Sequence, residues 1–115
     1  MKKELQSKKL EKFALDTIAD LKGLDPVCMD ISKMSSIADH MIVVTGTSSR
    51  HVKSISEEIV KRSKAAEYPV RMEGQEQAEW VLIDLGDVIV HVMQAATRKL
   101  YDLESLWKLA PVEKK

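Results

Sequence analysis

The fold of this chain is decided by one stretch, Trp80-Val81-Leu82-Ile83-Asp84-Leu85-Gly86-Asp87-Val88-Ile89-Val90-His91-Val92-Met93. Two apolar, largely β-branched runs flank Gly86-Asp87, a pair that favours the two-residue type I′ or II′ turns of β-hairpins. The stretch therefore predicts two antiparallel strands. Counting outward from the turn gives the cross-strand pairs Leu85–Val88, Asp84–Ile89, Ile83–Val90, Leu82–His91, Val81–Val92 and Trp80–Met93.

Successive side chains of a strand point to opposite faces, so this register gives the hairpin two unlike surfaces. One surface is entirely aliphatic and must face the core: Val81, Ile83, Leu85, Val88, Val90 and Val92. The other mixes large apolar groups with an aspartate and a histidine: Trp80, Leu82, Asp84, Ile89, His91 and Met93. Composition leaves two interpretations of this second surface, a further core layer or a docking surface for a partner.

Apolar spacing predicts three helical segments in the rest of the chain. The first runs from about Ser7 to Lys22, after six polar and frayed residues, and Gly23 stands at its C-terminal cap. The second begins with Ser48 or Ser49 as N-cap and ends before Tyr68-Pro69. The third spans Ala95 to Leu109, and Asp102 is placed to cap a second short helix within it. Its apolar positions are Leu100, Leu103, Leu106 and Trp107.

Three further strands are expected at Val27–Ile31, Ala38–Gly46 and Val70–Glu73. The run from Met41 to Val44 is continuously apolar, as in a central strand that is covered on both faces. The first two strands are joined by a short loop and should be antiparallel neighbours.

The resulting order, α-β-β-α-β-β-β-α, predicts an α+β (mixed α/β) fold with a five-stranded mixed sheet and flanking helices. The length fits a single domain over residues 1–115, with polar ends at about 1–6 and 109–115. Three short helices are few for both faces of five strands, which favours a partly open Trp80 surface.

Composition narrows the class of function. The 18 basic and 18 acidic residues cancel, which disfavours direct nucleic-acid binding as the main activity. The lone Cys28 lies in an apolar run and is expected to be a small buried hydrophobe of a reducing compartment. No apolar run reaches the length of a membrane helix, and the charged N-terminus has no signal-peptide core. We therefore expect a soluble, cytoplasmic protein.

The turn Gly46-Thr47-Ser48-Ser49 is the one place where the sequence suggests an anion site, because small residues precede the start of a helix. An ordinary capped helix is the favoured explanation. A nucleotidyltransferase would need a pair of carboxylates on the strand just beyond the turn to hold Mg²⁺, and the next strand offers only Glu73. The three histidines lack metal-ligand spacing. We expect no metal, no cofactor and no catalysis.

Several blocks of sequence together resemble the ribosomal silencing factor family, also called RsfS or Iojap-like. They are Asp30-Ile31, Ser35-Ser36, Ala38-Asp39, the block from Thr45 to Val52, Glu73-Gly74, Trp80 through Met93, Arg98, Tyr101, Leu103-Glu104 and Leu106-Trp107. The resemblance covers about residues 5–108. The blocks Thr45–Val52 and Gly86–Val92 are quite specific in combination.

The resemblance implies a fold like that of nucleotidyltransferases without their catalytic carboxylates. It implies a translation repressor that binds the fourteenth protein of the large ribosomal subunit, blocks joining of the small subunit sterically and lowers translation under nutrient limitation. It also implies homodimers when the protein is free. The alternative is a nucleotide-binding or nucleotidyltransferase-like enzyme that uses the Gly46–Ser49 turn.

Our hypothesis for docking places the partner on the Trp80 surface. Trp80, Leu82 and Met93 form its apolar centre, and Asp84 and His91 form its polar side. Ribosomal proteins are generally basic, so Asp84 and Glu73 are expected to pair with cationic groups of the target. Arg98 and Tyr101 follow the hairpin and are expected to extend the patch.

Overall fold

The computed structural model describes residues 2–108, and side chains are described from Gln6 to Leu106. The elements follow the predicted order, with the last helical segment divided in two at Asp102. They are α1 (Lys2–Asp20), β1 (Leu24–Asp30), β2 (His40–Gly46), α2 (Ser49–Ala65), β3 (Arg71–Glu73), β4 (Trp80–Asp84), β5 (Val88–Gln94), α3 (Ala95–Tyr101) and α4 (Leu103–Lys108). The expected polar tail 109–115 and the side chain of Trp107 lie outside the described residues.

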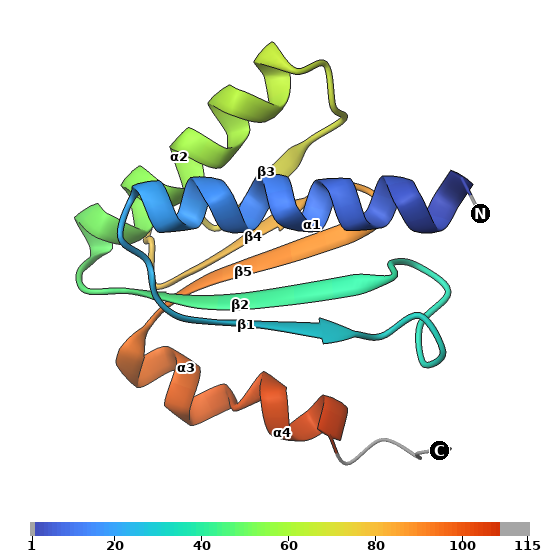
Figure 1. Cartoon of the computed structure of the whole chain (residues 1–115). Helices are drawn as coiled ribbons and strands as arrows, with labels where there is room; N and C mark the ends of the chain where they lie inside the picture. Colours follow the sequence, from blue (N-terminus) through green and yellow to red (C-terminus); the bar gives the residue numbers. More distant parts are fainter. Residues whose placement is uncertain (1, 109–115) are drawn as a thin grey trace.

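The five strands form one mixed sheet in the order β1-β2-β5-β4-β3. The pair β2–β5 is parallel, and the other neighbours are antiparallel, including β1–β2 as predicted. Helices α1 and α2 lie on one side of the sheet, and α3 and α4 lie on the other (Figure 1). The fold is therefore the predicted α+β arrangement with helices on both faces.

The hairpin has the predicted register. Its ladder runs from Trp80 opposite Met93 to Asp84 opposite Ile89. Beyond the ladder, the Leu85 N–H donates to the Val88 carbonyl at 2.9 Å. Gly86 has φ +90°, and Asp87 is not among the described residues with positive φ. Positive φ at the first turn position alone fits type II′ of the two predicted turns.

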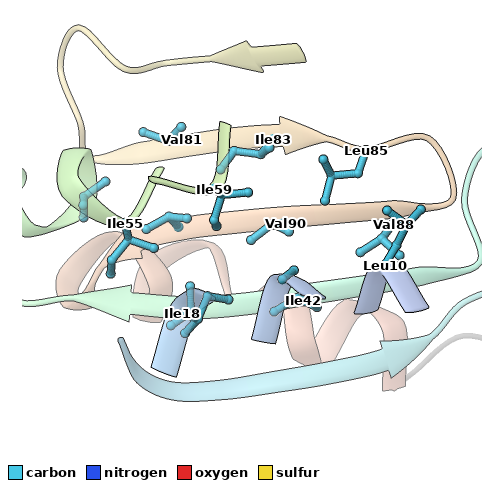
Figure 2. Packing of buried hydrophobic residues seen from close by; sticks show 14 of the residues in the cluster. Leu10, Ile18, Ile42, Ile55, Ile59, Val81, Ile83, Leu85, Val88 and Val90 are labelled. Carbon is cyan, nitrogen blue, oxygen red and sulfur yellow. The ribbon is translucent and has the colours of Figure 1, made fainter. Parts of the chain in front are cut away.

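The aliphatic face of the hairpin is the centre of the main core. All six of its predicted residues are at most 2% exposed. Side chains of α1 and α2 pack down onto it from one side of the sheet (Figure 2). The residues that these helices contribute are Leu10, Ala14 and Ile18 from α1 and Val52, Ile55 and Ile59 from α2. β2 is covered on both faces as expected, because Ile42 and Val44 join this cluster and Met41 and Val43 join a second one.

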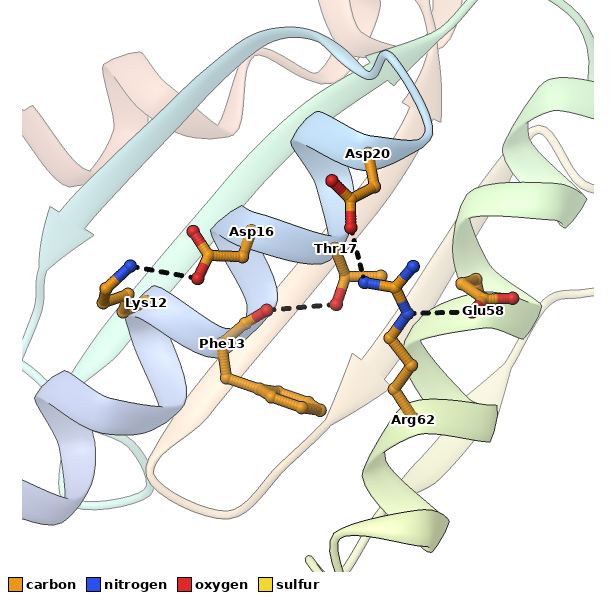
Figure 3. A network of polar contacts seen from close by, with 7 residues as sticks. All are labelled: Lys12, Phe13, Asp16, Thr17, Asp20, Glu58 and Arg62. Atoms are coloured by element: carbon orange, nitrogen blue, oxygen red, sulfur yellow. Dashed lines mark hydrogen bonds and ion pairs between the residues drawn. The ribbon is translucent and has the colours of Figure 1, made fainter.

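One arginine joins the two covering helices at their surface. Arg62 of α2 donates to Asp20 of α1 and to Glu58 of its own helix, both at 2.8 Å (Figure 3). Exposed pairs of this kind add little stability, so the buried aliphatic layer carries the packing of α1 on α2.

The N-terminal helix differs from the prediction at both ends. Residues 2–6 of the expected frayed segment are helical, because α1 begins at Lys2. The segment is rich in good helix formers, and the buried Ser7 hydroxyl anchors it by donating to Asp39 at 2.6 Å. At the other end, Lys22 takes the left-handed conformation (φ 61°) in place of Gly23. A Cβ at Gly23 would lie 2.6 Å from Ile18 Cγ2 and 2.7 Å from Val44 Cγ2, so this glycine is needed for close packing.

The sheet ends in two irregular edge strands. β1 begins three residues earlier than predicted and includes Pro26, with a register shift between Leu24 and Val27. β3 is only three residues long and carries Arg71 and Glu73.

None of the described helices is long and apolar enough to cross a membrane.

Neighbouring residues of β5 test the two-faced sheet. Val90→Asp places an unpaired charge in the aliphatic layer and should lower the free energy of unfolding by about 4 kcal/mol or more. Ile89→Asp changes the half-buried opposite face and should cost only about 1–2 kcal/mol. Urea denaturation followed by circular dichroism measures both. Equal losses would contradict the assignment of faces.

Candidate functional site

The sheet face opposite α1 and α2 is only partly covered. Leu103 of α4 packs against a second apolar cluster on this face, together with Trp80 and Ile89. The fully buried members of that cluster are Ile31, Ala38, Met41, Val43 and Met93. Trp80, Leu82, Asp84 and Ile89 stay half-buried. Both interpretations of this surface therefore hold in part, because α3 and α4 bury one portion of it and leave the β4 side accessible.

The indole of Trp80 contacts two aromatic rings on this face, those of His91 and Tyr101. Its indole Nε1–H donates to His91 Nδ1 at 2.9 Å, and the two rings lie 5.9 Å apart. The phenol ring of Tyr101, at the end of α3, lies 4.9 Å from the indole at an interplanar angle of 45°. Tyr101 is 55% exposed, so this aromatic pair reaches the molecular surface.

His91 is a buried hydrogen-bond acceptor. The ring is 8% exposed, and burial lowers its pKa from the ordinary 6.5 to about 4. At neutral pH the imidazole is therefore uncharged. Because Nδ1 accepts the indole hydrogen bond, the ring proton is on Nε2.

Like His91, two further predicted contact residues turn inward. Met93 has no exposed surface, because it lies in the second cluster, against which Leu103 of α4 packs. Arg98 was expected to extend the patch, but it makes a bidentate ion pair with Glu104 at 2.9 Å and donates to Thr45 Oγ1 at 2.9 Å. The Arg98 side chain is 13% exposed. Its contacts link α3 and α4 to β2.

The remaining predicted residues lie together. Glu73 of β3 is opposite Leu82, and Asp84 is opposite Arg71. Asp84 also accepts the Gly86 N–H at 2.8 Å, which fixes its carboxylate beside the hairpin turn. We call the accessible surface the open face; its residues are Glu73, Trp80, Leu82, Asp84, Ile89 and Tyr101.

Sequence reasoning missed two exposed apolar side chains of α3 and α4. Leu100 is 76% exposed and Leu106 is 62% exposed, although their helical spacing predicted a buried stripe. The break at Asp102, a left-handed residue with φ 47°, lets α4 change direction, so a single stripe does not continue across both helices. The Arg98–Glu104 pair was also missed, because a separation of six residues gives no signal within one helix.

The Gly46–Ser49 turn is occupied by the chain itself. The Ser48 hydroxyl caps α2 by accepting the His51 N–H at 3.1 Å, as predicted for the N-cap. The Thr47 N–H donates to His51 Nδ1 at 2.9 Å, and His51 Nε2 donates to the Leu21 carbonyl at 2.8 Å. A Cβ at Gly46 would lie 2.9 Å from the Val52 backbone nitrogen, so the glycine serves close packing of α2. This geometry favours a capped helix over an anion site.

Two further candidates for chemistry, the Cys28 thiol and a metal-binding cluster, are also poorly supported. The Cys28 thiol hydrogen-bonds Glu11, and burial together with this carboxylate raises its pKa to about 12, which keeps the thiol protonated and unreactive. Among residues 6–106, no group of three histidine, cysteine or acidic side chains is placed to hold a metal ion.

Known proteins share both the sequence and this geometry. A profile of the RsfS family, described as "Ribosomal silencing factor during starvation", matches residues 4–115. The chain belongs to the RsfS family. The ribosomal silencing factor RsfS of Chromobacterium violaceum is 43% identical over 104 residues, which cover 90% of this chain and 85% of that protein.

Structures and more distant relatives agree with membership of the RsfS family. A crystal structure of a Chromobacterium violaceum protein is 41% identical with a TM-score of 0.87, and the match covers 92% of this chain and 90% of that one. A mouse protein named "Mitochondrial assembly of ribosomal large subunit protein 1" is 28% identical over 85% of this chain and 46% of its own length.

The buried imidazole predicts a pH dependence of stability. The folded state holds the pKa of His91 near 4, below its ordinary 6.5, so the unfolded chain binds a proton first as the pH falls. The free energy of unfolding should fall between pH 6.5 and 4 by about 3 kcal/mol from this group. His91→Asn keeps an acceptor for the indole but does not titrate. Urea denaturation across this range should show a weaker pH dependence for the variant, and identical profiles would contradict the assignment.

Proposed function

We propose that this chain is a translation repressor that binds the large ribosomal subunit through its fourteenth protein. Binding there sterically blocks joining of the small subunit and lowers translation under nutrient limitation. The proposal rests on membership of the RsfS family and on the printed name of the mouse relative, which concerns assembly of the large ribosomal subunit. In this proposal the protein acts in the cytoplasm by occupying a surface and has no catalytic step.

The observation that carries the proposal is the half-covered aromatic pair of the open face. Aromatic side chains that are fixed by packing and still reach the surface are typical centres of protein interfaces. Trp80 is oriented by the His91 hydrogen bond and by the Tyr101 ring, so little side-chain freedom remains to be lost on binding. Leu82 and Ile89 extend this centre with apolar surface.

The polar groups of the open face suit a basic partner. Glu73 is exposed on the edge strand, and Asp84 is half-buried beside the turn. Met93 and Arg98 act in the proposal as supports, since Met93 lies in the second cluster and Arg98 holds α3 and α4 in place. His91 likewise orients the indole.

Removing the indole should weaken binding to large subunits. Trp80→Ala should raise the dissociation constant about 30-fold, which corresponds to about 2 kcal/mol. The aliphatic layer on the opposite face is untouched, so the variant should still melt cooperatively. Co-sedimentation with isolated large ribosomal subunits measures the binding.

Phe13→Ala is the matched control. Phe13 is also half-buried and packs edge-on against a tyrosine, Tyr68, at a centroid distance of 5.1 Å, but it lies on the α1 side of the sheet. It should lower stability and leave subunit binding unchanged. Normal binding by Trp80→Ala, or equal losses in both variants, would contradict docking through the open face.

The free protein is proposed to form a homodimer through the same face. Such a dimer would also offer cover for the exposed apolar side chains of α3 and α4, which are Leu100, Tyr101 and Leu106. Light scattering should then show a dimer that Trp80→Ala weakens. A subunit-joining assay separates this from a purely structural role, because dimerisation without inhibition of joining would contradict silencing.

A further inference from the structure

The charges of this chain are unevenly distributed although they cancel overall. Residues 70–106 contain seven carboxylates and only three cationic side chains, whereas the whole chain has 18 of each sign. This segment includes β3, β4, β5 and α3, and therefore the whole open face. The segment that carries the open face is acidic, and such a field attracts basic partners and repels phosphates.

A cavity opens within this acidic segment, beside Trp80. The loop between β3 and β4 lines a space of about 370 Å³. Its walls are Gly74, Gln75, Glu76, Gln77, Glu79 and Trp80. Trp80 thus belongs both to the open face and to the cavity wall.

The loop that forms the cavity is held in one shape. The Ala78 N–H donates to the Gly74 carbonyl at 3.0 Å, and Ala78 is 1% exposed in the left-handed conformation. The Gln94 side chain donates to the Ala78 carbonyl at 3.0 Å, and its backbone N–H donates to the Glu79 carbonyl at 2.9 Å. Gly74 has φ +92°, and a Cβ there would lie 2.4 Å from the Trp80 carbonyl oxygen. The cavity is therefore preformed.

The carboxylates of the cavity wall are available to a ligand. Within the described part of the chain, neither the Glu76 nor the Glu79 carboxylate forms an ion pair or a side-chain hydrogen bond. Both residues are exposed, and none of the six wall residues is cationic. The polar wall therefore presents acceptors and negative charge next to Trp80.

We propose that this cavity receives a basic side chain, a guanidinium or an ammonium group, from the protein segment that docks on the open face. The proposal rests on the proposed function and names the chemistry of the contact beside Trp80. A cation in the cavity can pair with the carboxylates through charge-assisted hydrogen bonds. An RNA phosphate in the same place would be repelled.

The test compares two pairs of substitutions that remove the same charge. Glu76→Gln with Glu79→Gln neutralises the cavity and keeps its size. Glu57→Gln with Glu67→Gln neutralises two exposed carboxylates in and directly after α2. Binding of each protein to isolated large ribosomal subunits is measured by co-sedimentation at several salt concentrations, and thermal melts check folding.

The cavity pair should raise the dissociation constant on the order of tenfold at low salt and reduce its salt dependence. The α2 pair should bind like wild type, and both should melt like wild type. Equal weakening by the two pairs would show only a long-range charge effect and would overturn the cavity contact. Unchanged binding by the cavity pair would overturn it too, and tighter binding would indicate phosphates there. Wild-type protein that fails to bind large subunits would instead overturn the proposed function, and with it the partner assigned to the cavity.

Discussion

The structure depends on the register of one hairpin. Because side chains alternate along a strand, the pairing of Ile83 with Val90 and of Leu82 with His91 sends all aliphatic groups to one face. A slip of one residue would turn over one strand relative to the other and place either Asp84 or His91 under α1 and α2, among the aliphatic side chains of the core. The short turn at Gly86, with its positive φ, prevents that slip. The packing of both covering helices follows from this one alignment.

The second face shows how a small domain keeps part of a sheet accessible. Helices α3 and α4 are seven and six residues long, and α3 has no buried residue of its own. They are held through a few contacts, chiefly Arg98 with Thr45 and Glu104, the ring of Tyr101 on Trp80, and Leu103 in the apolar cluster. These contacts cover Met93 and leave Leu82 and Ile89 half-exposed.

Local features of the sequence predicted the fold well. The hairpin pairs, the order of elements, the buried face and the Ser48 cap all depend on spacing and turn chemistry within a few residues, and the structure confirms them. The candidate surface was predicted less well because burial there depends on where α3 and α4 pack. Nothing near Met93 in the sequence shows that Leu103 will cover it. The partner of Arg98 lies in the next helix, and the loop before Trp80 gives no pattern that predicts a cavity.

The two ends of the sheet have a consequence for self-assembly. β1 is interrupted by Pro26 and a register shift, and β3 offers only three residues with charged Arg71 and Glu73. Neither margin presents a long, regular row of free backbone groups on which another chain could add a strand. Growth of fibrils from this fold is thereby discouraged, and any association between copies is directed to side-chain contacts on the broad surfaces.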